Sequence, residues 1–386
     1  MRYLLQSIAD GFRQLGSRKL YFACMLLVPL FGCFFFLDLM KEGLPVKVPS
    51  AIVDLDHSQM SRQLTQNLAA TELVSITEAP EDFHAALELM REGKILGFFL
   101  IPENFAKDAI AGRETTISYY NNLSVYVPGS LVYKGFKSTS VRSIASMAVS
   151  QLMSVGMTPE KATQLVSPVN VSVRTPGNPW LNYSIYLSNS FLPALLALMV
   201  TCVTAFSICE ELKSGHSRKW LERAGGSMFV ALLGKLIPQS LVFTCVGVLM
   251  QSMLFGYCHF PLNNHPMHMI LAMWFVVVAC QWFAVAICCV VPNLRLALSL
   301  CSLTGILAFS IAGFSFPVEQ MYGAIGILSY ILPVRYYFLI YIDQALNGIP
   351  IFYSRFYYAA LLCFPLVGMI GMARLRKRCL NPVYVP

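Results

Sequence analysis

Six long apolar runs are spaced along the chain, and an extended polar stretch separates the first run from the second. The first run, Leu20–Leu37, has no charged residue and is just long enough for a helix that crosses a bilayer, which needs about 17 to 25 residues. The other runs are Leu187–Ile208, Phe229–Tyr257, Met267–Val291, Leu296–Phe316 and Phe356–Ala373. The pattern predicts a polytopic α-helical membrane protein with six transmembrane helices, one at residues 20–37 and five within residues 184–373.

The polar stretch, residues 38–183, follows a different pattern. Segments rich in β-branched and aromatic residues alternate with segments of helical periodicity. The expected strands cover residues 51–55, 73–77, 95–101 and 115–121, and the expected helices cover 58–70, 81–92, 104–111 and 130–155. This alternation predicts a small α/β domain inserted between the first two spans.

Charge and cysteine placement orient these segments. Basic residues gather at both ends of the chain, at Arg2, Arg13, Arg18 and Lys19 and again at Arg374, Arg376, Lys377 and Arg378. Because cytoplasmic flanks of spans are rich in Lys and Arg, both termini are expected in the cytoplasm. Residues 38–183 carry twelve Lys or Arg, fourteen Asp or Glu and none of the twelve cysteines, as suits an extracytoplasmic domain. The excess positive charge behind the net charge of +8 thus lies in the cytoplasmic flanks of the spans, and it does not indicate nucleic-acid binding.

The residues before the first span are amphipathic at helical spacing. Leu4, Ile8, Phe12 and Leu15 fall on one face, and Gln6, Asp10, Arg13 and Gln14 on the other. We expect residues 1–19 to form an elbow helix in the inner interface and residues 374–386 a cytoplasmic tail. A plain cytosolic extension is the alternative for the leader. A cleaved signal peptide is disfavoured, because its apolar core is usually about 7 to 15 residues long and no small-x-small pattern precedes Asp38.

The apolar stretch 313–348 is interrupted by Pro and Gly and contains charged residues. Irregular backbone at membrane depth is tolerated only where protein or water covers it. We therefore expect two short re-entrant helices on the outer side, next to a second subunit. The residues expected at this outer gate are Pro317, Glu319, Pro333, Arg335 and Asp343. Arg335 and Asp343 share a helix face, where they either pair across the gate or face water.

Lys235 lies inside the third apolar run. Ionisable residues within spans are candidates for function, but a lysine near the inner end of a span can also extend its ammonium group to the cytoplasmic surface. The second role is favoured here, because Lys235 lies only eight residues past Ser227, the last residue of the charged stretch before this run.

The sequence contains no pattern typical of an active site. Phosphate binding by a P-loop needs G-x-x-x-x-G-K-[ST], and the nearest match, Gly11 to Gly16 followed by Ser17 and Arg18, lacks the lysine. Asp54, Asp56 and His57 follow an expected strand, where such residues usually close a turn and cap the next helix. We predict no catalytic, cofactor-binding or metal-binding residue, so ATP hydrolysis would require a separate subunit.

Four sequence blocks, in order, are similar to those of a known family. They are VPSAIVDLDHSQMSRQL, GKILGFFLIPENF, NPWLNYSIYLSNSFLPALL, and GFSFPVEQM followed by LSYILPVRYYFLIYIDQALNG. Together they resemble the type-2 ABC transporter permeases of bacterial exporters, in the branch with a large extracytoplasmic domain between the first two transmembrane helices. The resemblance covers nearly the whole chain.

The charged connector 209–227 lies where that family has its coupling helix, which docks into a groove on the ATP-binding subunit. The resemblance implies ATPase-coupling roles for Glu210, Glu211, Lys213, Gly215 and Arg218. The commoner form of the family has a second Glu where Lys213 stands and Thr where His216 stands. We expect Glu211 to lie on the docking surface, outside the hydrocarbon, so that Glu211→Lys would disturb docking and leave the fold intact.

The resemblance implies a permease subunit of an ATP-driven exporter in the bacterial inner membrane. Two such subunits, as a homodimer or a heterodimer, would work with two ATP-binding subunits that hold ATP and Mg²⁺, and a periplasmic membrane-fusion adaptor could join them. The cargo would be hydrophobic or amphipathic, and nothing in the sequence identifies it. The alternative is a non-transporting receptor or assembly protein whose spans are only an anchor. An anchor does not need a coupling helix, which favours the exporter.

Overall fold

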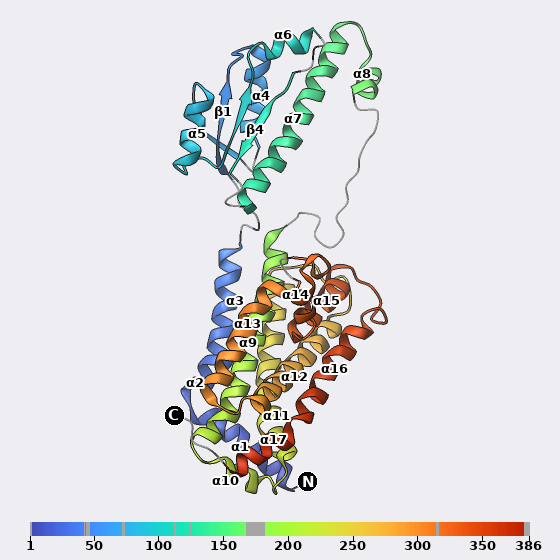
Figure 1. Ribbon diagram of the computed structural model, residues 1–386. Coiled ribbons are helices and arrows are strands. Elements are labelled where there is room, and N and C mark those ends of the chain that lie inside the picture. The colour runs from blue at the N-terminus through green and yellow to red at the C-terminus, as the bar shows by residue number, and fades with distance from the viewer. Residues whose placement is uncertain are drawn as a thin grey trace. The chain divides into compact units, whose positions relative to one another are not determined.

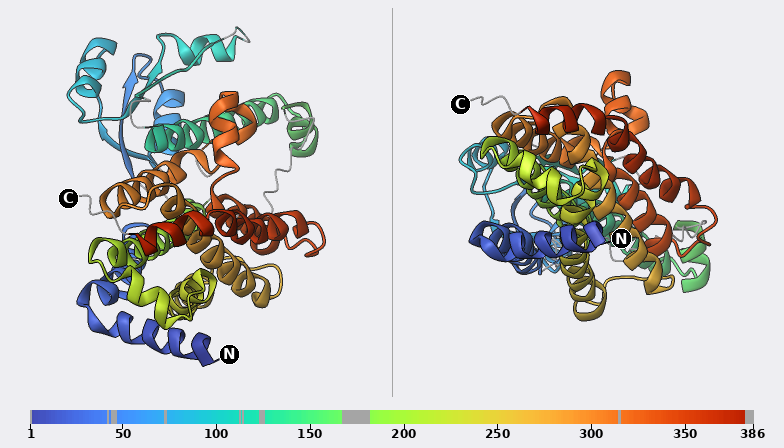
Figure 2. Two further views of the ribbon diagram at one scale, coloured as in Figure 1. Left: turned by 60° about the horizontal axis from the view of Figure 1, so that its bottom comes forward. Right: turned by 90° about the horizontal axis from the view of Figure 1, so that it is seen from below.

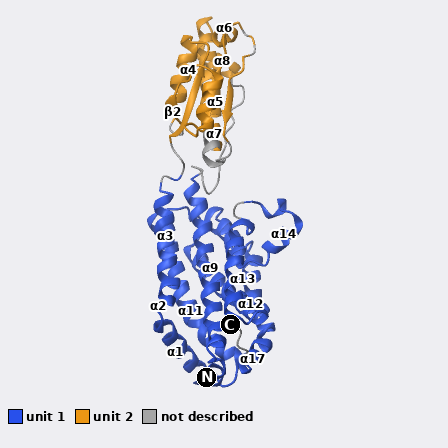
Figure 3. Cartoon of the chain, turned by 60° about the vertical axis from the view of Figure 1, so that its left-hand side comes forward, with its two compact units in different colours: residues 1–43, 174–386 blue, residues 44–173 orange. Residues whose placement is uncertain are grey.

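The computed structural model describes residues 2–41, 43, 47–71, 74–111, 113, 115–122, 126–166, 182–313 and 316–381. They form two compact units, drawn in Figure 1 and coloured separately in Figure 3: residues 1–43 with 174–386, and residues 44–173. Residues 167–181 of the polar stretch and the last residues of the expected tail, 382–386, lie outside the described residues.

The first unit, called the membrane unit below, is helical. Within its described residues, six stretches are long and apolar enough to cross a membrane: Lys19–Leu39, Tyr183–Lys213 (α9), Met228–Tyr257, Pro266–Val290 (α12), Leu294–Ile311 (α13) and Arg355–Leu380. Three of these stretches comprise several elements, namely α2 (Lys19–Phe22), η1 (Ala23–Leu27) and α3 (Val28–Leu39); α11 (Met228–Gln251) and η2 (Ser252–Tyr257); and α16 (Arg355–Ile370) and α17 (Met372–Leu380). This arrangement fits the expected polytopic protein with six spans.

α9 is the central helix of the membrane unit. It packs against α3, α12 and α13. In its most apolar stretch 67% of the residues are buried, against 17% in α13 and 17% in Arg355–Leu380. The outer helices therefore leave apolar side chains exposed, among them Leu303, Ile306, Leu366 and Val367. Such surfaces suit contact with lipid or with a second subunit.

α1 (Arg2–Ser17) lies across the end of the helical bundle, as the view from below in Figure 2 shows. It ends where Arg18 takes an extended backbone conformation, and α2 begins at the next residue. α1 packs on α11 through buried Ser7 and Gly11, and Ser7 Oγ donates to the Val230 carbonyl at 3.4 Å. The side chains of Tyr3, Leu5 and Phe12 stay exposed. The face toward the protein is thus small and polar, and apolar side chains remain free for lipid.

Segment 313–348 contains two short helices, α14 (Gly323–Ser329) and α15 (Pro333–Tyr341), the second continuing as η4 (Ile342–Leu346). A short turn, η3 (Val318–Gln320), precedes them. The two helices are bent by 81° at the break between them, which is the geometry of a broken span or of a re-entrant loop. Pro333 opens α15 and explains the break, because it lacks the N–H group that would continue α14.

The C-terminal residues differ from the simple tail expected at 374–386. α17 continues to Leu380, and Leu375 and Cys379, one turn apart, are buried. It packs against α10 (Ser217–Arg223) and α11, and Ser217 Oγ donates to the Cys379 carbonyl at 2.8 Å. The pair of apolar positions at helical spacing explains why this basic segment is folded onto the protein.

The second unit, called the inserted unit below, contains a four-stranded sheet in the order β2-β1-β3-β4. The strands are β1 (Val48–Asp54), β2 (Val74–Glu78), β3 (Gly97–Ile101) and β4 (Ser118–Asn121). β1 is parallel to β2 and β3, and β4 is antiparallel to β3. The helices are α4 (Gln59–Ala69), α5 (Phe83–Arg91), α6 (Phe105–Ile110), α7 (Tyr126–Ser154) and α8 (Pro159–Val166). This small sheet with alternating helices is compatible with the expected α/β insertion.

Alternate side chains of the strands supply two apolar cores. Ile52 and Phe99, opposite each other in the register of β1 and β3, pack with Leu64 of α4. Their neighbours Val53 and Phe98 point to the other face and pack in a second cluster that includes residues of α5. Strands buried on both faces read as continuous apolar runs, which is why β3 was evident in the sequence.

The Asp54 carboxylate closes the turn after β1. Its Oδ1 accepts from the N–H groups of Asp56 and His57, both at 3.1 Å, and its Oδ2 accepts from Ser61 Oγ at 2.7 Å. Asp56 accepts from the Ala106 N–H at 3.2 Å. The turn-closing interpretation is confirmed for Asp54, whereas Asp56 binds the start of α6 and the next helix, α4, is capped by Ser58.

Candidate functional site

The connector 209–227 leads from α9 to α11 through the short helix α10. α9 ends at Lys213, and Gly215 follows with φ of +72°, a conformation that glycine adopts without steric cost. α11 begins after Ser227, whose Oγ accepts from the Val230 N–H at 3.5 Å. These turns fold α10 back over the end of the bundle, where it contacts α1, α9, α11 and α17.

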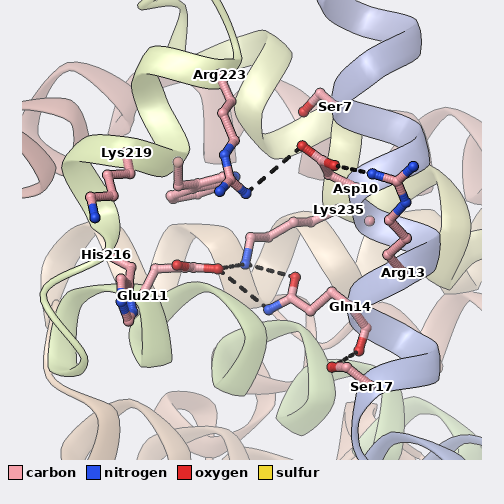
Figure 4. Close-up of a pocket in the computed structure, with 12 residues that line it drawn as sticks. Ser7, Asp10, Arg13, Gln14, Ser17, Glu211, His216, Lys219, Arg223 and Lys235 are labelled. Carbon is pink, nitrogen blue, oxygen red and sulfur yellow. Dashed lines mark hydrogen bonds and ion pairs between the residues drawn. The ribbon is translucent and has the colours of Figure 1, made fainter.

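A cavity of about 410 Å³ lies between α1, the connector and the start of α11 (Figure 4). Its lining is mostly polar and charged: Ser7, Asp10, Gly11, Arg13, Gln14, Ser17, Glu211, His216, Lys219, Trp220, Arg223 and Lys235. Three segments that are far apart in the sequence meet here. The interactions among them decide which of the predicted coupling residues face outward.

Lys235 is the centre of this cluster. Its side chain is only 4% exposed, and its Nζ donates to Glu211 Oε1 at 2.8 Å, Gln14 Oε1 at 2.9 Å and the Ser207 carbonyl at 2.7 Å. The ammonium group also lies 4.8 Å from the centre of the Trp220 ring. All three donors of the ammonium group are satisfied inside the protein. The expectation that Lys235 extends to the cytoplasmic surface is therefore wrong.

Both predicted glutamates of the connector are turned toward the chain itself. Glu210 forms an ion pair with Arg18, in the turn between α1 and α2, and Glu211 binds Lys235 and accepts from Gln14 Nε2 at 3.4 Å. The two side chains are only 16% and 19% exposed. Glu211→Lys would thus place a second cation beside a buried ammonium group. We therefore expect this substitution to destabilise the fold, in contrast to the expectation from the sequence.

The other predicted coupling residues, Lys213, Gly215 and Arg218, are exposed. Of the neighbours that line the cavity, His216, Lys219 and Arg223 are also exposed. Gln14, Arg18 and Trp220 were not predicted from the sequence as members of this cluster. The one available signal was Lys235 itself, because a lysine within an apolar run has to find partners.

The residues predicted at the outer gate lie just before η3 or on η3, α15 and η4. Pro317 and Glu319 are exposed, and Pro333 is buried. Arg335 is 6% exposed; its Nη1 donates to the Ala312 carbonyl at 3.3 Å, and its guanidinium lies 4.8 Å from the centre of the Tyr330 ring.

Asp343 accepts from Ser354 Oγ at 2.9 Å. Among the ion pairs of the described residues, none joins Arg335 to Asp343. Within one subunit, each of these two groups is held by its own local partners.

The apolar helices, the connector and the bent helix pair together define a multi-pass membrane protein with an internal polar cluster at one end. The family model described as "ABC-2 family transporter protein" matches residues 19–373, so the chain belongs to that family. This confirms the resemblance to type-2 ABC transporter permeases. Among curated proteins, none matches the chain significantly.

Membership in this family makes the chain a membrane permease of an ABC transporter, a transport subunit rather than an enzyme. It also implies an ABC ATP-binding partner and a membrane setting for the apolar helices.

Proposed function

We propose that this chain is the permease subunit of an ATP-driven exporter in a bacterial inner membrane. It moves a hydrophobic or amphipathic substrate outward from the cytoplasm or the inner leaflet. Two permease subunits, identical or similar, assemble with two ATP-binding subunits that hold ATP and Mg²⁺. Both termini and the connector 209–227 lie in the cytoplasm, and the inserted unit lies outside, where it could meet an adaptor protein.

The observation that carries this proposal is the Lys235 cluster. One ammonium group on α11 binds the end of α9 through Ser207 and Glu211, binds α1 through Gln14, and lies against Trp220 of α10. Removing one partner of a buried ion pair costs about 3 to 5 kcal/mol, and this pair joins the ends of α9 and α11 between which α10 lies. A partner that displaces α10 therefore displaces two spans and the elbow helix with it. A receptor with a simple anchor has no use for such a linkage.

The bent pair of α14 and α15 is the proposed outer gate. We assign it to the re-entrant form, facing the second permease subunit near the exit. α14 leaves Ile325, Ile327 and Leu328 exposed, an apolar surface that a neighbouring subunit could cover. Arg335 fixes this segment to the end of α13 through the Ala312 carbonyl, whereas the exposed Glu319 is available at the exit.

We expect the chain to purify from its native membrane with an ATP-binding subunit, and the ATPase rate of that subunit to rise when this chain is present in lipid vesicles. The control is a partner whose phosphate-binding lysine has been replaced, which should assemble without hydrolysing ATP. A chain that purifies without any ATP-binding subunit, or leaves the partner's ATPase rate unchanged, would support the receptor or assembly protein instead.

A further inference from the structure

The exposed part of the connector is basic. Between residues 213 and 223 it carries Lys213, Arg218, Lys219 and Arg223, and Glu222 is the single acidic residue. All five side chains are exposed. We call the four basic residues the basic connector surface.

The way α10 is anchored directs these side chains outward. Its buried contacts are Ser217, bonded to the Cys379 carbonyl, and Leu221. Trp220 turns toward the Lys235 ammonium group. With these three positions used inside the protein, the charged side chains of this helix remain exposed, and two of them, Lys219 and Arg223, also line the open cavity beside α1.

The nearby carboxylates do not neutralise this surface. Glu210 and Glu211 are engaged by Arg18 and Lys235. Asp10 lies 4.0 Å from Arg223, but it also lies 3.5 Å from Arg13, a further cation at the same end of the chain. The charge presented to a partner is therefore positive, although the sequence of the connector contains as many as three glutamates.

We propose that the ATP-binding subunit presents an acidic surface, rich in Asp and Glu, to the basic connector surface. This inference rests on the proposed function, because it concerns the partner expected to dock at the connector. A coupling helix with exposed glutamates would bind a basic groove on its partner. Here Glu210 and Glu211 are paired within the chain and the exposed residues are basic, so the expected charge of the partner's surface is reversed.

A protein partner is favoured over an anionic lipid by the position of α10. Figure 1 shows α10 at the lower end of the membrane unit, beyond the ends of α9 and α11 to which it is joined. α10 therefore lies past the ends of the two spans that it connects. Exposed charges in such a contact act mainly on the rate of association and on its salt dependence.

The test measures binding of the ATP-binding subunit to the full chain in nanodiscs of neutral phosphatidylcholine. The variant is Arg218→Glu with Lys219→Glu; both side chains are exposed, so the fold should persist. We expect this double reversal to weaken binding about tenfold or more, chiefly through slower association, and wild-type binding to weaken as salt is raised. Glu222→Lys should bind as tightly as the wild type or more tightly, and Lys107→Glu, at an exposed position on α6 of the inserted unit, should bind unchanged.

Each contrary result has its own meaning. Binding of the double reversal at wild-type strength, or stronger, would overturn the acidic-partner inference and leave the proposed function standing. A loss of binding that occurs only in nanodiscs containing anionic phosphatidylglycerol would show that the surface binds lipid, and would also overturn it. A wild-type chain that binds no ATP-binding subunit in either lipid would overturn the proposed function itself.

Discussion

Glu211→Lys should destabilise the membrane unit more than any other single charge change on the connector. The new ammonium group would lie beside that of Lys235, which is 4% exposed and cannot move into water without leaving three partners. Uncompensated buried charge costs about 3 kcal/mol or more. Because the Glu211 side chain is 19% exposed, some of this cost is relieved by solvent. We expect the apparent melting temperature in detergent to fall by about 5 to 10 °C.

Two comparisons separate this effect from a general effect of charge. Glu222→Lys makes the same chemical change at an exposed position of the same connector and should alter stability by less than about 0.5 kcal/mol. The exchange of Glu211→Lys with Lys235→Glu should recover part of the loss, since the ion pair is restored. Recovery stays incomplete because a carboxylate at position 235 cannot donate to the Ser207 carbonyl, which loses its hydrogen bond. Equal stability of the Glu211→Lys and Glu222→Lys variants would contradict the assigned role of the cluster.

Gly11→Ala should detach the elbow helix from α11. A Cβ on Gly11 would overlap the carbonyl oxygen of Gly234, and it would lie 3.0 Å from Pro238 Cγ. Backbone atoms of α11 cannot yield, so α1 has to shift and draw Gln14 away from Lys235. Overpacking of this kind usually costs about 1 to 3 kcal/mol. Hydrogen exchange of the α1 amides, measured by mass spectrometry, should accelerate about tenfold or more.

The same helix supplies a matched control. A Cβ on Gly16 would have nothing within 4 Å, so Gly16→Ala should leave the packing of α1 unchanged or strengthen the helix by up to about 1 kcal/mol. If Gly11→Ala and Gly16→Ala show the same exchange, close packing of α1 on α11 is not what holds the elbow helix in place.

The elements that the sequence predicted are those set by local periodicity. Apolar runs long enough to span a bilayer predicted the spans, and the alternation of strand-like and helix-like segments predicted the inserted unit. The breaks at Pro317 and Pro333 gave the two short helices of segment 313–348. In each case the signal lies within a few neighbouring residues, and the structure places the elements within a few residues of the expected bounds.

The cluster could not be predicted in the same way, because its contacts join distant parts of the chain. Lys235 and Gln14 are 221 positions apart, and no local pattern pairs them. The side of α1 that packs on the protein could not be predicted either. The amphipathic pattern is set by apolar residues, whereas the residues buried in the packing are Ser7 and Gly11. Glu211 illustrates the consequence: the residue was identified as important, and its partner was not.

The proposed function requires the connector to lie on the side of the membrane where ATP is bound, and the inserted unit to lie on the other side. The most direct measurement is labelling of single cysteines by an impermeant maleimide in sealed right-side-out vesicles, in a background where the native cysteines are replaced. Lys107→Cys on α6 and Lys213→Cys at the end of α9 both offer exposed side chains. We expect label at position 107 in intact vesicles and label at 213 only after the membrane is opened; label at 213 and not at 107 in intact vesicles would contradict the account.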